Sequence, residues 1–162
     1  MTASPPAGAT TSLKPYLFRF TWAYALCAVV LAVIASFLPF DIGSGAGIAT
    51  LFAAAGASGQ KFAQDQSRLP DKSERLRFAL WASLLTWLVT LLLLAAIVFA
   101  NIGLGGAPNF LAYTLGYAID FIRNNLGLAI AVTLVATIVQ VALIYYIWNS
   151  FARMILKHAK PR

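Results

Sequence analysis

The stretch GQKFAQDQSRLPDKSERLRF, residues 59–78, is the only strongly polar run in a chain that is otherwise mostly apolar. It holds five of the twelve Lys and Arg residues and three of the five acids, and apolar stretches flank it on both sides. Hydrophobic residues make up 60% of the chain and charged residues 10%, and the mean hydropathy is +0.79. This composition is typical of a protein whose main solvent is lipid. We interpret the polar run as the turn of a membrane hairpin.

The apolar segments on either side should be helices. They lack the alternation of a membrane β-barrel, and unsatisfied backbone groups are costly in hydrocarbon. Hydropathy and length therefore predict an all-α polytopic membrane protein, a four-transmembrane-helix bundle with spans at about residues 16–40, 42–60, 78–100 and 126–148.

Three further segments flank or connect these spans. Residues 109–123 are too short and too polar to cross the membrane, so they predict a short outer interfacial helix with Tyr113 and Tyr117 on one side. Residues 1–15, rich in Pro, Ala, Thr and Ser, predict a disordered lead-in. Residues 151–162 predict a basic cytoplasmic tail.

The polar run itself contains the signals of a helix end and a helix start. The second helix is expected to continue past Gln60, with Phe62 on the membrane surface, until Pro70 stops it. Asp71 has the features of an N-cap, and Glu74 three residues later completes a capping box. The two acids are therefore assigned a structural role.

The distribution of positive charge predicts the orientation. Of the twelve Lys and Arg residues, only Arg123 lies on the side opposite the polar run when four spans are drawn. Short loops rich in Lys and Arg stay in the cytoplasm, so both termini and the polar run should be cytoplasmic. The net charge of +7 is explained by basic residues that flank membrane spans and contact the anionic lipid headgroups of the bilayer. Nucleic acid is therefore not expected as a partner.

Small residues dominate the second span. Gly45, Ala49, Ala53 and Ala57 recur every four residues, a spacing that lets another helix approach closely. Packing inside the chain is the preferred interpretation, and a homo-oligomer through this face is the alternative. In the last span, Gln140 lies on a more polar face, and its amide is expected to make a hydrogen bond between helices.

The sequence offers little chemistry. Apart from Arg19 at the start of the first span, the four spans contain no Asp, Glu, Lys, Arg or His, which argues against a proton-coupled exporter. Cys27 and His158 are single, so no metal site, haem ligation or cofactor is expected. Enzyme activity would need a cytoplasmic pocket that unites Arg68, Glu74 and His158. We therefore expect no catalytic residues.

The basic residues of the polar run have a second interpretation. Arg68, Arg75 and Arg77 could form a patch that contacts lipid headgroups or an acidic partner. A nucleotide or phosphorylated ligand is disfavoured because the run carries no glycine-rich phosphate cradle.

The polar run also carries a resemblance. The small-residue helix and the pattern F…R-x-P…E-R…S that follows it resemble a family of short bacterial inner-membrane proteins with four predicted spans and no assigned activity; the pattern is formed by Phe62, Arg68, Pro70, Glu74, Arg75 and Ser83. The resemblance covers the second and third spans best. It implies a bacterial cytoplasmic membrane and a four-span topology, and it supplies no catalytic residues.

The function that these features favour is binding. A chain poor in reactive groups and rich in packing surface is expected to bind another membrane-embedded protein, as an immunity protein against a membrane-targeting toxin or as an accessory subunit of a complex would. The alternative is a small oligomeric transporter or channel, which a polar cavity near Gln140 at mid-membrane depth would favour.

Overall fold

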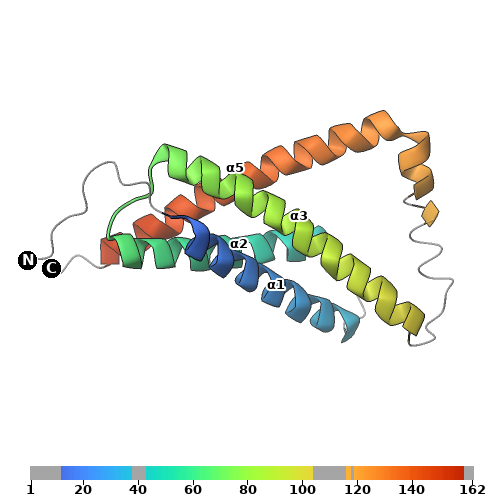
Figure 1. Cartoon of the computed structure of the whole chain (residues 1–162), viewed down its shortest axis with the longest axis horizontal. Helices are drawn as coiled ribbons and strands as arrows, with labels where there is room; N and C mark the ends of the chain where they lie inside the picture. The colour runs from blue at the N-terminus through green and yellow to red at the C-terminus, as the bar shows by residue number, and fades with distance from the viewer. Residues whose placement is uncertain (1–11, 38–42, 104–115, 118, 159–162) are drawn as a thin grey trace, which may run out of the picture.

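The structure, a computed structural model, describes residues 12–37, 43–103, 116–117 and 119–158. Its elements within these residues are helices and no strand occurs among them, which confirms the all-α class. The four long helices are α1 (Lys14–Phe37), α2 (Gly43–Gln66), α3 (Lys72–Gly103) and α5 (Leu126–His158) (Figure 1). Residues 119–124 form a further short helical stretch at the far side of the molecule.

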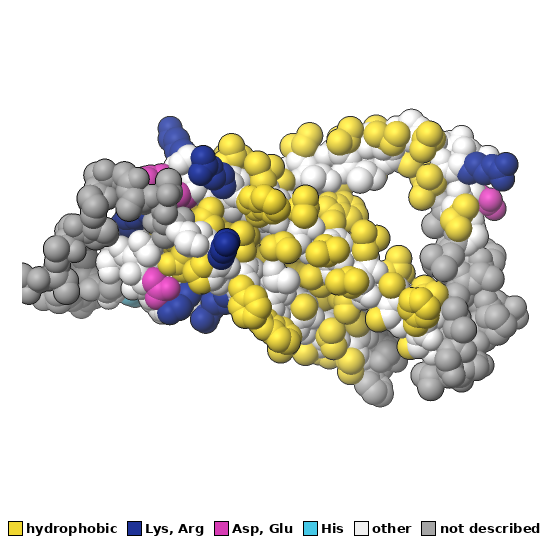
Figure 2. Space-filling model, viewed as in Figure 1, with side chains coloured by type: hydrophobic (Ala, Val, Ile, Leu, Met, Phe, Trp, Pro, Cys, Tyr) yellow, Lys and Arg dark blue, Asp and Glu magenta, His cyan; other side chains and the backbone are white. Residues whose placement is uncertain are grey.

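The four helices share one end. The start of α1, the end of α2, the start of α3 and the end of α5 lie together (Figure 1). Lys and Arg side chains gather there in the space-filling view, far from the smaller charged group beside the short helical stretch (Figure 2). We call this end the basic end. Within the bundle, α2 and α3 each pack against both α1 and α5.

The core lies close to the basic end and is built from aromatic rings. Trp148 of α5 is fully buried and stacks on Phe78 of α3, with ring centroids 4.2 Å apart. Phe62 of α2 lies 5.0 Å from Trp148 and 5.1 Å from Tyr16 of α1. Phe20 of α1 meets Phe78 edge-on at 5.8 Å. Every long helix therefore contributes a ring. The prediction that Phe62 lies on the membrane surface is wrong, because its ring is buried between Tyr16 and Trp148 inside the bundle.

Away from the basic end, α3 and α5 separate. Residues 88–100 of α3 and 126–139 of α5 contain no buried residue. The arm formed by α5 leaves the rest of the bundle, and a gap is visible beside it in the space-filling view (Figure 2). We call residues 88–100 of α3 and 126–139 of α5 the outer half.

Three of the four helices can cross a membrane by length and composition. These segments are Lys14–Ile34, Lys72–Ala100 and Leu126–His158. Helix α2 has as many residues as α1, but it is less apolar because Gly, Ala and Ser make up much of its length. The chain is thus a membrane protein with three helices of spanning character.

The helix ends differ from the predicted spans in a consistent way. Helix α2 extends beyond Gln60 to Gln66, and α3 begins at Lys72, directly after the predicted N-cap Asp71 and six residues before the predicted span, both as expected. Helix α5 continues to His158, so most of the predicted tail is helical, and α1 begins at Lys14, inside the predicted lead-in. Polar residues can continue a helix beyond the hydrocarbon layer, which hydropathy alone does not report. Residues 1–11, 38–42, 104–115, 118 and 159–162, including most of the predicted interfacial helix, lie outside the described part.

Candidate functional site

The predicted packing stripe of α2 does not point into the bundle. Gly45, Ala49 and Ala53 are exposed, and Ala57 is half-buried. The buried face of α2 is a neighbouring one, which includes Thr50, Leu51, Ala54, Ala55, Ser58 and Phe62. The expected internal packing therefore falls on other small residues of the same helix.

Among the described glycines, Gly59 makes the tightest contact with another helix. A Cβ atom added there would lie 2.6 Å from the backbone oxygen of Trp148, so only glycine lets α2 and α5 approach this closely. One turn earlier, a Cβ on Gly56 would lie 3.0 Å from the ring of Phe151. The hydroxyl of Ser58 donates to the backbone oxygen of Tyr16 at 2.9 Å and so links α2 to α1.

The elbow, residues 67–71 between α2 and α3, is held by Glu74. One carboxylate oxygen of Glu74 accepts from the backbone N–H of Asp71 at 2.9 Å, which confirms that part of the capping box. The two carboxylate oxygens also accept from both terminal nitrogens of Arg68, at 2.9 and 2.7 Å. This hydrogen bond raises the pKa of Arg68 above its ordinary value. The bidentate pair makes the turn rigid.

The three arginines of the predicted patch have different environments. Arg68 is paired with Glu74 and lies over the ring of Phe62 at 5.4 Å. Arg75 is half-buried, and its guanidinium lies 5.0 Å from the ring centre of Tyr145 on α5. Arg77 is exposed. The structure thus involves Arg68 and Arg75 in packing between elements and leaves Arg77 open to the surroundings.

The three side chains that enzyme activity would need make different contacts. Arg68 and Glu74 face each other, whereas the Nδ1 atom of His158 lies 2.8 Å from the backbone oxygen of Met154 on its own helix. Within the described ranges, no group of three His, Cys, Asp or Glu side chains could hold a metal ion.

A cavity lies where the aromatic core ends and the outer half begins. It has a volume of about 390 Å³ and is lined by residues of all four long helices: Tyr24, Gly47, Ile48, Leu51, Thr86, Trp87, Thr90, Ala136, Val139, Gln140 and Leu143. No Asp, Glu, Lys, Arg or His is among these described residues. Ile48, Trp87 and Val139 are exposed, so the cavity opens to the outside of the bundle.

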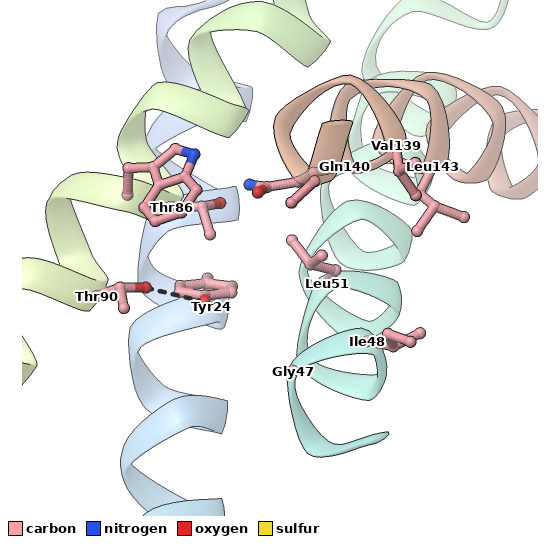
Figure 3. A pocket seen from close by; sticks show the side chains of 11 residues that line it. Tyr24, Gly47, Ile48, Leu51, Thr86, Thr90, Val139, Gln140 and Leu143 are labelled. Carbon is pink, nitrogen blue, oxygen red and sulfur yellow. Dashed lines mark hydrogen bonds between the residues drawn. The ribbon is translucent and has the colours of Figure 1, made fainter. Parts of the chain in front are cut away.

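Gln140 is the most polar side chain in this cavity. Its Nε2 atom is buried, and within the described residues it has no hydrogen-bond partner. Figure 3 shows the side chain pointing from α5 toward Thr86 and Tyr24. The expected hydrogen bond between helices is therefore missing at this nitrogen. Its neighbours on the same helix, Thr133 and Thr137, donate to backbone oxygens of α5 itself.

The opposite wall carries hydroxyl groups. The oxygens of Tyr24 and Thr90 lie 3.3 Å apart, longer than the usual separation for two hydroxyls. The hydroxyl of Thr86 donates to the backbone oxygen of Ala82 at 2.9 Å. Sequence reasoning identified Gln140 but did not connect it with Tyr24, because nothing local in the sequence says which faces of α1, α3 and α5 meet.

The depth of the cavity follows from the helix rise. Gln140 is about 20 Å along α5 from Arg153, and Thr90 is about 20 Å along α3 from Arg77. If the basic end lies at the headgroups of a hydrocarbon layer about 30 Å thick, both side chains lie near or just beyond its middle. That placement of the basic end would put the cavity at about mid-membrane depth.

Comparisons with known proteins give no relative: no family model, no curated protein and no solved structure matches this chain. The resemblance to the four-span bacterial family stays a prediction. All six residues of its pattern lie in the described part of the chain. Phe62, Pro70 and Ser83 are buried, and Arg68, Glu74 and Arg75 make the contacts described above at the elbow.

Proposed function

We propose that this chain is a non-enzymatic protein of a bacterial inner membrane that acts by binding a membrane-embedded protein partner. The observation that carries the proposal is the outer half, where the long apolar helices α3 and α5 separate and bury no residue. Helices of one small bundle usually pack along their length. Separated spans leave apolar faces on which a partner's transmembrane helix can pack.

The basic end supports the same interpretation from the other side. The buried rings, the glycine contacts and the Arg68–Glu74 pair fix the helices firmly there. A rigid base that holds two separated arms is suited to presenting a binding surface, because little order is lost when a partner binds. An immunity protein against a membrane-targeting toxin and an accessory subunit of a complex both fit this role.

The topology that belongs to this proposal has four spans and cytoplasmic termini. Helix α2 is the least apolar of the four, but it packs along α1 and α5, so part of its surface contacts protein instead of lipid. The grouping of positive charge at one end supports a cytoplasmic location for that end. Labelling of single cysteines placed at Ser12 and Lys157, in a Cys27→Ser background, should occur only from the cytoplasmic side.

Crosslinking at defined positions tests the partner. A photoreactive amino acid would replace Leu92 or Val135 in the outer half, and Leu80 or Leu84 as controls, because all four side chains are exposed apolar ones. In native membranes we expect one adduct of defined mass from the outer positions and none from the controls. Equal labelling from both sets would contradict the proposal, and so would solute movement or lipid turnover by the purified protein in liposomes.

A small oligomeric transporter or channel is the second candidate. Two observations favour it: the mid-depth cavity at Gln140, and the exposure of Gly45, Ala49 and Ala53, which leaves a small-residue face open for self-association. Native mass spectrometry in nanodiscs would reveal a defined oligomer, and Ala49→Phe should break it. A monomer that moves no solute would reject this candidate.

A further inference from the structure

We propose that the mid-depth cavity binds a lipid-soluble molecule with a quinone-type head, whose carbonyl oxygens accept hydrogen bonds from Gln140 on one wall and from the Tyr24–Thr90 pair on the other. This site borders the outer-half surface proposed for a protein partner, because Thr90, Ala136 and Val139 line the cavity and also belong to the outer half. It would take a small molecule from the bilayer and needs no second protein.

The size and lining of the cavity suit a small ligand. Ligand pockets commonly measure roughly 300–1,000 Å³ and are lined mainly by apolar side chains with a few polar groups that orient the ligand. The cavity measures about 390 Å³, and Leu51, Ile48 and Leu143 are among its apolar lining. A partner's helix, about 10 Å wide with its side chains, is too large for it. The volume therefore favours a ring over a macromolecule.

The chemistry of the ligand follows from Gln140. Its Nε2 atom is a buried donor without a partner among the described residues. A buried donor left without a partner is costly, and the surrounding acyl chains offer no acceptor at this depth. The ester carbonyls of phospholipids lie near the membrane surface, so they do not reach the middle of the bilayer. A ligand that satisfies the amide must bring its own acceptor oxygen into the apolar layer.

The opposite wall extends this requirement to a second oxygen. In the Tyr24–Thr90 pair one hydroxyl accepts, so its own hydrogen remains available to a ligand. Figure 3 shows the Gln140 amide extending from α5 toward Thr86, with the Tyr24–Thr90 pair contributed by α1 and α3. Two donors contributed by different helices to one mainly apolar cavity match a flat ring that carries two carbonyl oxygens. Trp87 also lines the cavity and adds an aromatic side chain against which such a ring can pack.

Gly47 provides a way to close the site without disturbing the bundle. It lines the cavity, and a Cβ atom added there meets no atom within 4 Å. A leucine at this position would therefore extend into the cavity instead of into a neighbouring helix. Gly45, two residues away on α2, also has open space around it but does not line the cavity. The two glycines form a matched pair of test and control.

The experiment uses the full chain in nanodiscs and tritium-labelled decylbenzoquinone as the probe, with retention corrected for empty nanodiscs. We expect saturable retention by the wild type and by Gly45→Leu, and loss of retention in Gly47→Leu. Unlabelled decylbenzene, which has the same tail and no carbonyl, should compete at least tenfold more weakly than unlabelled decylbenzoquinone. In Gln140→Leu, retention should weaken about five- to tenfold, the effect of one hydrogen bond.

Each result decides the proposal. Absence of saturable retention by the wild type, undiminished retention by Gly47→Leu, or equal competition by decylbenzene would overturn it. Circular dichroism and size-exclusion chromatography establish whether each variant is folded. If Gly47→Leu does not fold, Ala136→Leu fills the cavity from α5 and must give the same loss, because Ala136 also lines it.

Discussion

At the basic end, rings from four helices touch in one cluster, whereas a few turns further along α3 and α5 every residue is at least partly exposed. Both regions are apolar, so hydropathy does not distinguish them. The difference lies in shape: glycine lets backbones meet at the basic end, and aromatic rings fill the space between helices there. In lipid, where apolar side chains gain little from leaving the solvent, such close packing is what holds helices together.

The comparison assigns different roles to the two regions. The basic end contains the packed core and the elbow contacts, whereas the cavity and the separated arms lie beyond it. Substitutions at the basic end should therefore change stability, and substitutions in the outer half should change binding.

The largest effect is expected from Trp148→Ala. This side chain is fully buried and contacts Phe78 and Phe62, so its removal leaves a cavity in the centre of the bundle. We expect a loss of about 3–5 kcal/mol in the free energy of unfolding, measured by titration from mild detergent into SDS with circular dichroism. Trp81→Ala is the control because Trp81 is 58% exposed, and it should cost less than about 1 kcal/mol. Equal losses would show that the core is not at the basic end.

Gly59→Ala should have the next largest effect. The added methyl group would collide with the backbone oxygen of Trp148, which cannot move away as a flexible side chain could. We expect a loss of about 2–3 kcal/mol in the same titration. Gly45→Ala, where the added atom meets open space, should be neutral or stabilising by up to about 1 kcal/mol, because alanine favours helix. If the free energy of unfolding changed with the same sign in both variants, this result would contradict the close contact of α2 with α5.

Glu74→Ala should cost less, because the elbow is only partly buried. The substitution removes the acceptor for the Asp71 N–H and the partner of Arg68, and we expect a loss of about 1–2 kcal/mol. Asp65→Ala is the control: Asp65 pairs with Lys61 at 2.7 Å on the surface of α2, where such pairs contribute about 0.5 kcal/mol or less. Thermal unfolding of the two variants side by side gives the comparison. A loss no greater for Glu74→Ala would mean that the elbow is not held by its carboxylate.

The features that could be predicted from the sequence are the local ones. Long apolar runs predicted the helices, and Asp71 followed by Glu74 predicted the start of α3, because both signals depend on neighbours in the chain. The contacting face of α2 could not be predicted in this way. Small residues occur on several faces of that helix, and each residue turns the helix by about 100°, so Gly45 and its stripe are indistinguishable in sequence from the face of Ser58 and Ala54.

The outer half and the cavity could not be predicted from the sequence, for a related reason. Apart from Thr90, Thr133 and Thr137, the outer turns of α3 and α5 are apolar, so their sequence gives little indication of the direction in which to pack. Gln140 was recognisable because a lone amide in an apolar run is unusual. Its unpaired nitrogen and its position opposite Tyr24 depend on where α1, α3 and α5 diverge, which is a property of the whole bundle.

Gln140→Leu should give the smallest change, and one of opposite sign. The leucine keeps a similar volume and removes a buried donor that has no partner among the described residues, so we expect a gain of about 0.5–1 kcal/mol in the free energy of unfolding. Gln64→Leu is the control because Gln64 is exposed at the basic end, and it should leave stability unchanged. A loss of 1 kcal/mol or more in Gln140→Leu would mean that the amide already has a partner inside the bundle. A gain together with weaker quinone retention would show that the amide lowers stability and serves binding, which is the expected behaviour of a group kept for a ligand.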